Sequence, residues 1–427
     1  MNLGDSNSKY FYRLMKKRQT QSYISQITDE EGSNYTEPSG IAAAFVDHFQ
    51  NILGPAITIH YPDLSHVTPH GLVTNKDALN ILKPVTQSEI ENVIKNANPN
   101  KAPGPDGFNA HFFKVCWPII GKDVCAGIKD FFQYGSMLKQ LKKTFIVLVP
   151  KTENANSPDK FRPISLTNEL YKIISHILVN RLKLIIAKIV GPMQLAFVPG
   201  RSITGNILLA QDLIHNYHLN QGSPRMCIKL DLAKAYDSVR WDFLEAALRR
   251  LHFPDHVIKL LMECVSGAQF SVLVNGGAEG YFKATRGLRQ GCPLSPFRFA
   301  IVMEFFSIMM VQYAKAKLIP SPFVKRDVTI SHLMFVDDLI VFSKASTGAT
   351  VNLRHFLLHF IKFIGLGVNW LKSAIFFTKC KEDDRTAISS ILNVPQAQFP
   401  VRYLGIPLSS KKLNFNDCQA LLAKVQQ

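Results

Sequence analysis

The sequence offers little that would suggest a secreted, membrane-spanning or disulfide-bonded protein. Its seven cysteines are scattered, odd in number and without a Cys-x-x-Cys pair, which argues against a disulfide framework or a zinc site of standard spacing. The first twenty residues lack the apolar core of a signal peptide. The longest apolar run, residues 299–311, is too short to cross a bilayer and contains Glu304. We therefore expect a reduced, intracellular protein without a membrane partner.

Acidic residues are also scarce. The chain has 32 Asp and Glu against 49 Lys and Arg, a net charge of +17 at pH 7. Such an excess predicts a polyanionic partner, nucleic acid rather than a membrane surface, although charge alone leaves open a basic protein without one. The hydrophobic content of 47% excludes a wholly disordered chain, and 427 residues exceed one ordinary domain.

The spacing of apolar residues predicts helices separated by a few strands. An apolar pattern over residues 41–52, ended by Gly54-Pro55, predicts a helix, and residues 54–85 look like a connector. The first twenty residues predict a basic helix that either tracks phosphates or is simply solvated. Its shared face would hold Lys9, Arg13, Lys16 and Lys17.

Further along the chain, Thr86 opens a short helix, and the Pro/Gly-rich KAPGPDGF segment, residues 101–108, forms a loop. This loop is either a structural turn or a basic element near a phosphate backbone. The whole pattern is that of an α+β protein with a small antiparallel sheet. The other expected elements are a strand over 145–149, a long helix over 171–190, a strand from 226 ending at Asp231, a helix over 244–251, a hairpin over 270–284 with a loop longer than two residues, and a buried helix over 299–311.

The sharpest local signal is a pair of adjacent acids between two apolar runs. Residues 333–336 and 339–342 are separated only by Asp337-Asp338, which predicts two strands joined by a two-residue turn. Two carboxylates ~4 Å apart repel by roughly 1 kcal/mol in water and about 4 kcal/mol near a partly buried surface. A divalent cation such as Mg²⁺ would reverse that repulsion, although turn chemistry also favours Asp. By contrast, Asp383-Asp384 lies in a wholly charged stretch and predicts a solvated loop.

A third acid strengthens the metal hypothesis. Asp231 ends an apolar strand, so its carboxylate could stand at the edge of the same sheet. Acids from separate strands form the usual receptacle for two metal ions that catalyse in-line displacement at phosphorus. Asp237 is expected instead to cap a helix that begins near Ser238.

Two further features suit a nucleotidyl transferase. Tyr236 is close enough to Asp231 to wall a sugar pocket, where it would exclude a ribose 2′-hydroxyl; otherwise it is a core aromatic. The loop RGLRQGCPLSPF, residues 286–297, has glycines that permit close backbone approach to a base pair or sugar.

In this order, the motifs resemble the reverse transcriptase of non-LTR (LINE-type) retrotransposons, in the form common in plant genomes. The motifs are KAPGPDGF, FRPISLTNELYKIISHILVNRLK, QLAFVPGRSI, KLDLAKAYDSV, RGLRQGCPLSP, FVDD, GLGVNWLKS and YLGIPL, and residues 1–20 also look like the spacer before that polymerase. The resemblance implies a right-hand polymerase fold and RNA-directed DNA synthesis primed from a nicked target. It also implies RNA template, DNA primer and dNTPs as partners, with two Mg²⁺ ions, or Mn²⁺, as cofactor.

The resemblance assigns roles to individual residues. Asp231, Asp337 and Asp338 match the catalytic triad, with Asp231 and Asp337 as the principal metal ligands, and Tyr236 matches the aromatic sugar gate. The matches to nucleotide-binding positions are Lys151, Arg162, Gln290, Gly291 and Lys372. The matches to the primer grip are Tyr403, Leu404 and Gly405.

The sequence departs from the family pattern in three places. Cys292 stands where Asp is usual, Gly205 where Asp is common, and Val336 where Ala is frequent. No endonuclease or Cys/His-rich segment is recognisable, so we expect a fragment of an element. The implied domains are an N-terminal extension or linker with a basic helix (1–85), fingers (86–225), palm with some finger elements (226–410) and the start of a truncated thumb (411–427).

The leading hypothesis is therefore a metal-dependent reverse transcriptase domain. A non-catalytic nucleic-acid-binding remnant is the alternative that Cys292 and Gly205 suggest. An RNA-dependent RNA polymerase shares the metal chemistry, but Tyr236 argues against it. The element's life cycle implies work in the nucleus, and the sequence leaves the oligomeric state open.

Overall fold

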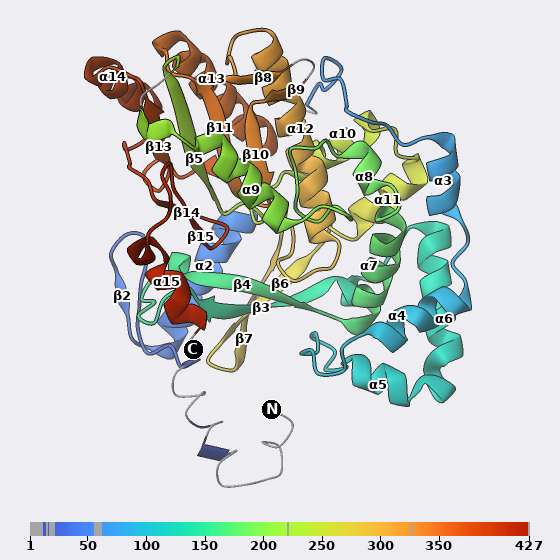
Figure 1. Ribbon diagram of the computed structural model, residues 1–427. Coiled ribbons are helices and arrows are strands. Elements are labelled where there is room, and N and C mark those ends of the chain that lie inside the picture. Colours follow the sequence, from blue (N-terminus) through green and yellow to red (C-terminus); the bar gives the residue numbers. More distant parts are fainter. Residues whose placement is uncertain are drawn as a thin grey trace.

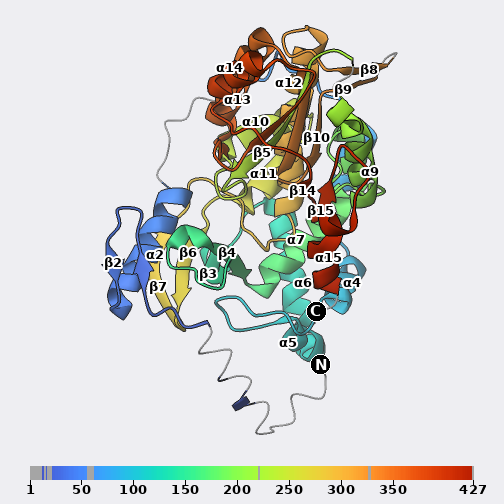
Figure 2. The same cartoon turned by 60° about the vertical axis from the view of Figure 1, so that its left-hand side comes forward.

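The protein is built on two larger sheets with helices packed around them (Figure 1, and turned by 60° in Figure 2). A computed structural model describes residues 12, 13, 16, 22–54, 62–219, 222–325 and 328–425. The basic helix expected over residues 1–20 lies almost entirely outside these described residues and stays a prediction.

A five-stranded antiparallel sheet occupies the upper half of Figure 1, which agrees with the α+β expectation. Its strands follow the order β10-β11-β5-β12, and β13 also pairs with β5, so β5 is the central strand. The bounds are β5 Arg225–Ala233, β10 His332–Phe335, β11 Asp338–Lys344, β12 Gly367–Val368 and β13 Ala374–Thr378. Strand β5 continues two residues beyond Asp231, the predicted end, because Leu232 and Ala233 pair with β12.

The two faces of this sheet bury different side chains, as expected for strands whose residues alternate in direction. Met226, Ile228 and Leu230 of β5 belong to the main core with four helices. Cys227 belongs instead to a smaller core with Phe342 and with a helix and a hairpin on the opposite face. The helices of the main core are α10 Trp241–Arg250, α11 Asp255–Glu263, α12 Ser295–Lys315 and α13 Thr347–Ile364, and the opposite face is covered by α9 Ile203–Ile214 and the hairpin β14 Val401–Tyr403 and β15 Ile406–Leu408.

A four-stranded sheet of order β4-β3-β6-β7 lies below (Figure 1). Strands β3 and β6 are parallel, and the other pairs are antiparallel. Phe45 and Phe49 of a long amphipathic helix, α2, pack against this sheet through Phe161 and Phe270. The bounds are α2 Pro38–Leu53, β3 Lys143–Pro150, β4 Phe161–Thr167, β6 Gln269–Val274 and β7 Gly277–Lys283, and the short ribbon β1 Ile27–Thr28 and β2 Asn34–Tyr35 lies beside α2.

A group of helices extends the main core to the right of Figure 1. Arg181 joins two of them, because its guanidinium donates two hydrogen bonds to the carboxylate of Glu89. These helices are α3 Asn75–Leu82, α4 Gln87–Asn96, α5 Ala110–Val115, α6 Trp117–Tyr134, α7 Glu169–Leu182 and α8 Ile186–Ile189. The remaining elements are η1 Lys139–Lys142, η2 Pro158–Lys160, η3 Tyr217–Leu219, β8 Phe323–Lys325, β9 Val328–Ile330, α14 Glu382–Leu392 and α15 Phe415–Val425.

Several predicted elements need correction. The long helix over 171–190 is wrong, since α7 ends at Leu182 and α8 begins at Ile186. The break leaves Ile185, Ile186 and Ile189 buried, so the apolar spacing of a continuous helix is kept across it. Asp383-Asp384 is not in a loop. Both acids lie in the first turn of α14, where their negative charge interacts favourably with the helix dipole.

The two hairpin turns also differ from expectation. The turn between β6 and β7 is the two-residue Asn275-Gly276, with φ of 49° and 93°, a left-handed pair that suits a tight hairpin. The turn between β10 and β11 is Val336-Asp337 rather than Asp337-Asp338, because Phe335 pairs with Asp338. Val336 has a φ of 59°, which is costly for a β-branched residue.

Helix α12 is the one described helix that is long and apolar enough to cross a membrane. However, 78% of its apolar window is buried inside the protein. Phe299, Ile301 and Phe305 are fully covered, so the helix serves as the centre of the main core.

Candidate active site

The structure brings the first acid directly beside the other two. Asp231 of β5 and Asp338 of β11 are partners in the antiparallel register, and Asp337 is the preceding turn residue. Directly opposite residues in such a pair have Cβ atoms about 4.5–5.5 Å apart on the same face. The backbone pairing alone therefore places carboxylates from two distant segments side by side.

The alternation of the strands decides which face the acids occupy. Cys227 of β5 and Ile340 of β11 lie in the smaller core under α9 and the β14–β15 hairpin. Asp231 is four residues beyond Cys227, and Asp338 is two residues before Ile340, so both share that face. The acids therefore lie on the sheet face opposite the helices of the main core, at the end that α9 and the hairpin leave exposed.

The electrostatics of the acids reflect their crowding. Lys229 Nζ lies 3.7 Å from Asp338 Oδ1. Partial burial raises the pKa of Asp338; Lys229 opposes this rise, and the charges of Asp337 and Asp231 add to it. Lys229 is two residues before Asp231 on the same strand face, a position that strand alternation could have revealed from the sequence.

The three carboxylates suit a divalent cation that takes some of its ligands from the substrate. Among the described residues, no three His, Cys, Asp or Glu side chains form a ready-made metal site. Mg²⁺ is usually bound by one or two carboxylates together with substrate phosphates, rather than by an all-protein cage. Carboxylate oxygens at a crowded, half-exposed edge meet that requirement, with Asp231 and Asp337 as the expected ligands.

Tyr236 lies beside the acids on a rigid support. Its ring stacks on the buried ring of Phe299, with centroids 4.8 Å apart and planes 14° from parallel. Burial and the charge of Asp337 both raise the pKa of Tyr236. The aromatic ring is therefore fixed within electrostatic reach of a predicted metal ligand, and the two readings of Tyr236, core aromatic and pocket wall, are compatible.

The glycine-rich loop, residues 286–297, is hydrogen-bonded to β4 and to Asp237. The Gln290 carbonyl accepts a hydrogen bond from Ser165 N of β4, and the Gln290 amide donates to both carboxylate oxygens of Asp237. Gly291 has a φ of 105°, and a Cβ there would lie 3.1 Å from the Ser165 carbonyl oxygen. Only glycine suits this conformation and this close approach.

The capping role predicted for Asp237 is therefore wrong. Helix α10 begins at Trp241 with Arg240 as its N-cap, and Asp237 is buried against Gln290. Burial raises the pKa of Asp237 to about 6, although the Gln290 hydrogen bonds favour the charged form. An acid that binds a neighbouring loop gives no signal in the sequence.

The three predicted basic residues lie near one another. Arg162 lies on β4 opposite Val149, two residues before Lys151, while Lys372 follows β12. Burial lowers the pKa of Lys151, and the nearby charges of Arg162 and Lys372 lower it further. All three side chains are exposed, so together they form a cationic surface suited to an anion.

The predicted primer-grip residues form the tip of the β14–β15 hairpin. Leu404 and Gly405 are its two turn residues, with φ of 49° and 88°. The Tyr403 hydroxyl donates to Asn206 Oδ1 over 3.1 Å, and Asn206 Nδ2 donates to the Met334 carbonyl on β10. Asn206 thus ties the hairpin to the strand that leads into Asp337, a role for which sequence spacing gave no indication.

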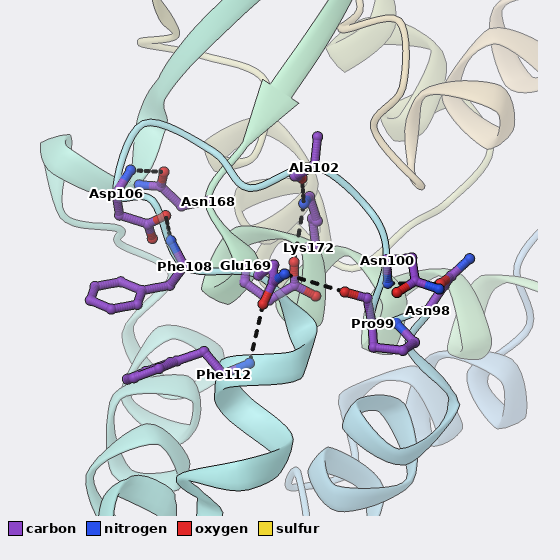
Figure 3. Close-up of polar contacts among 11 residues, drawn as sticks. Asn98, Pro99, Asn100, Ala102, Asp106, Phe108, Phe112, Asn168, Glu169 and Lys172 are labelled. Carbon is purple, nitrogen blue, oxygen red and sulfur yellow. Dashed lines mark hydrogen bonds and ion pairs between the residues drawn. The ribbon is translucent and has the colours of Figure 1, made fainter. Parts of the chain in front are cut away.

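The KAPGPDGF loop is a fixed element rather than a loose connection (Figure 3). Asp106 N donates to Asn168 Oδ1, and Lys172 Nζ donates to the Ala102 carbonyl and to Glu169. A Cβ on Gly104 would lie 2.4 Å from Asn168 N, so only glycine allows this contact. The loop is packed on the start of α7, which supports its reading as a structural turn.

Two of the three departures from the family pattern, Cys292 and Gly205, are distant from the acids in the sequence. Local contacts accommodate both. Cys292 is buried, with its Sγ 3.3 Å from the Tyr171 hydroxyl. Gly205 lies in the first turn of α9, where its N–H donates to the capping Ser202 hydroxyl.

The fold and the site together define a class of protein. A helix-backed antiparallel sheet with acids at one edge, a grip hairpin over that face and a second sheet carrying cations is the palm and fingers of a right-hand nucleic-acid polymerase. The chain belongs to the reverse transcriptase family: the family sequence model described as "Reverse transcriptase (RNA-dependent DNA polymerase)" matches residues 149–408.

Two curated relatives agree with this assignment, and one solved structure is also similar to the chain. The chain is 27% identical over 339 residues to the transposon TX1 uncharacterized 149 kDa protein of Xenopus laevis, covering 79% of this chain and 25% of that protein. It is 26% identical over 275 residues to a Pol polyprotein from the type-2 retrotransposable element R2DM of Drosophila melanogaster, covering 63% and 24%. A truncated apo telomerase from Candida tropicalis has a TM-score of 0.42 at 14% identity, over 57% of this chain and 51% of that chain.

The chain thus spans about a quarter of the length of these curated relatives. The resemblance to reverse transcriptases of non-LTR retrotransposons is confirmed. The plant-type form and the domain boundaries stay predictions.

Proposed function

We propose that this chain is an RNA-directed DNA polymerase domain that adds deoxynucleotides to a primer 3′-OH on an RNA template. The observation that carries the proposal is the pairing of Asp231 with Asp338 across β5 and β11, beside Asp337. In the reaction, the primer 3′-oxygen attacks the α-phosphorus of the dNTP, a new P–O bond forms and pyrophosphate leaves.

The carboxylates would hold two Mg²⁺ ions, or Mn²⁺, through Asp231 and Asp337. Bound there, such ions activate the primer hydroxyl and neutralise charge on the attacking and leaving oxygens. Lys229, 3.7 Å from Asp338, offsets part of the negative charge of the acids. Asp338, the third acid of the predicted catalytic triad, would lie beside these two ligands with Lys229 as its partner.

The cations on the finger side would bind the triphosphate. Lys151, Arg162 and Lys372 carry positive charge close together, and Arg is suited to bidentate contact with phosphate. Tyr236, fixed on Phe299, would exclude a ribose 2′-hydroxyl and so select dNTPs. Gln290 and Gly291, fastened to β4 and Asp237, would form the floor beneath the base pair.

The β14–β15 hairpin would position the primer. Its tip, Leu404-Gly405, projects from a strand whose Tyr403 is bound through Asn206 to β10. The net charge of +17 supports an RNA template and a DNA primer or target as polyanionic partners. Because a retrotransposon polymerase copies RNA onto genomic DNA, we also propose that the chain acts in the nucleus.

Primer extension tests this function. The purified chain, given an RNA template with an annealed DNA primer, dNTPs and Mg²⁺, should extend the primer, and the Asp337→Asn variant should not. Circular dichroism of the variant checks that the fold is kept. A folded, template-binding protein that extends no primer with Mg²⁺ or Mn²⁺ would instead favour a non-catalytic nucleic-acid-binding remnant.

A further inference from the structure

A polar cavity of about 370 Å³ lies at the base of the β14–β15 hairpin, at the opposite end from the Leu404-Gly405 tip. It is bounded by β13, η3, α14 and the segments that enter and leave the hairpin. Of these elements, β13 and α14 lie at the left of Figure 1. Its wall includes Tyr217, Phe376, Arg385, Gln396, Phe399 and Lys411. None of these residues has a role in the polymerase reaction described above.

The charge of the wall selects an anion. Arg385, Lys411 and His218 line the cavity, and no acidic residue does. Arg385 has one ion pair, 3.5 Å to Glu382, whose side chain is 73% exposed and lies outside the wall. His218 Nδ1 lies 2.8 Å from the Ser410 carbonyl oxygen, which fixes the imidazole at the rim.

The remaining wall residues suit a nucleobase. Phe399 stacks on Phe376, with centroids 4.4 Å apart and planes 19° from parallel, and Tyr217 meets Phe399 edge-on. Gln396 and Gln398 are exposed and offer amide donors and acceptors. Aromatic rings beside cations are the usual means of binding single-stranded nucleic acid.

We propose that this cavity binds one nucleotide unit of a single-stranded nucleic acid, with the base at Phe399 and the phosphate at Arg385 and Lys411. Its position at the base of the grip hairpin suits a strand that leaves the polymerase face. The inference does not depend on the polymerase reaction, because binding is measured without metal or dNTP.

Photocrosslinking tests the inference on the full chain. A short oligo(dT) carrying one 5-iododeoxyuridine, irradiated with the protein in EDTA, should crosslink to peptides that contain Tyr217 or Phe399, as mapped by mass spectrometry. Lys411→Ala should weaken this crosslink by about tenfold, the loss expected for a charge-assisted contact. Lys412→Ala removes the same charge next to the cavity wall and is the matched control.

Phe399→Leu separates base stacking from a structural role. It keeps an apolar side chain beside Phe376 but removes the ring, so the protein should stay folded by circular dichroism while the crosslink falls. If dTMP competes with the oligo(dT) crosslink, a free nucleotide also binds in the cavity, which supports the nucleotide assignment. Displacement by inorganic phosphate at the same concentration as dTMP would overturn it, as would crosslinks confined to other peptides or unaffected by both substitutions.

Discussion

Asp231 and Asp338 lie directly opposite each other in the register of two neighbouring antiparallel strands, β5 and β11. The pairing extends over seven residues, from Asp338 with Asp231 to Lys344 with Arg225, so a slip of one residue would turn the buried side chains of both strands outward. The position of the acids is therefore fixed by the hydrophobic cores on both faces of the sheet. By contrast, Asp383-Asp384, another pair of adjacent acids, lies in the first turn of helix α14 and not at a strand end.

Removal of the Tyr236 ring should relax sugar selection. Tyr236→Ala should raise incorporation of NTPs relative to dNTPs by about tenfold or more, because the wall that meets a 2′-hydroxyl is gone. Tyr236→Phe keeps the ring stacked on Phe299 and should keep selection close to that of the unchanged chain. Single-nucleotide incorporation with each substrate measures the ratio. Equal ratios for all three proteins would show that Tyr236 is only a core aromatic.

Loss of a finger cation should weaken dNTP binding more than it slows chemistry. Arg162→Ala should raise KM for dNTPs by about tenfold, since a charge-assisted contact to phosphate is lost. Lys160→Ala is the matched control, because Lys160 Nζ is held by Asn156 Oδ1 at 2.6 Å. Steady-state kinetics at saturating primer and template measures both constants. An unchanged KM would remove Arg162 from the triphosphate site.

Asn206 should couple stability to primer positioning. Asn206→Ala leaves the Tyr403 hydroxyl and the Met334 carbonyl without their partner, which should cost about 1–3 kcal/mol of unfolding free energy. Tyr403→Phe removes one of these bonds and should cost less. Denaturant unfolding gives the free energies, and primer affinity gives the functional effect. Wild-type primer affinity in a folded Asn206→Ala variant would contradict the coupling.

Stability should fall in mild acid because of His332. This residue is fully buried between the Ser331 and Ser307 hydroxyls, and burial lowers its pKa to about 3. An unfolded His takes up its proton below about pH 6.5, so the unfolded state gains relative stability as pH falls. The free energy of unfolding should fall by about 2 kcal/mol between pH 7 and pH 5. His332→Gln should flatten this dependence, the exposed His111→Gln should not, and equal slopes would contradict the assignment.

The sequence predicted the elements of the site well where strand alternation and motif order agreed. Met226 to Leu230 alternate and lead to Asp231, and two apolar runs flank Asp337-Asp338, so the meeting of the three acids followed from sheet geometry. The turn itself was misplaced by one residue. Val336 takes a left-handed conformation that its side chain disfavours, and only the register of β10 with β11 reveals it.

Contacts between distant segments could not be predicted. Asp237 looked like a helix cap because it precedes an apolar helix, yet Gln290 binds it from a loop far along the chain. The break after Leu182 preserves helical apolar spacing, so the pattern alone gave one long helix. Asn206 sits in an ordinary amphipathic helix, and its link to Tyr403 exists only in the folded protein.

The most direct test of the central claim compares two neutralised acids in the same assay. Asp231→Asn should reduce Mg²⁺-dependent primer extension on an RNA template by about a thousandfold or more, with an unchanged thermal midpoint. Asp383→Asn removes the same charge from α14 and should extend primers like the unchanged chain. Full extension by a folded Asp231→Asn protein would contradict the account.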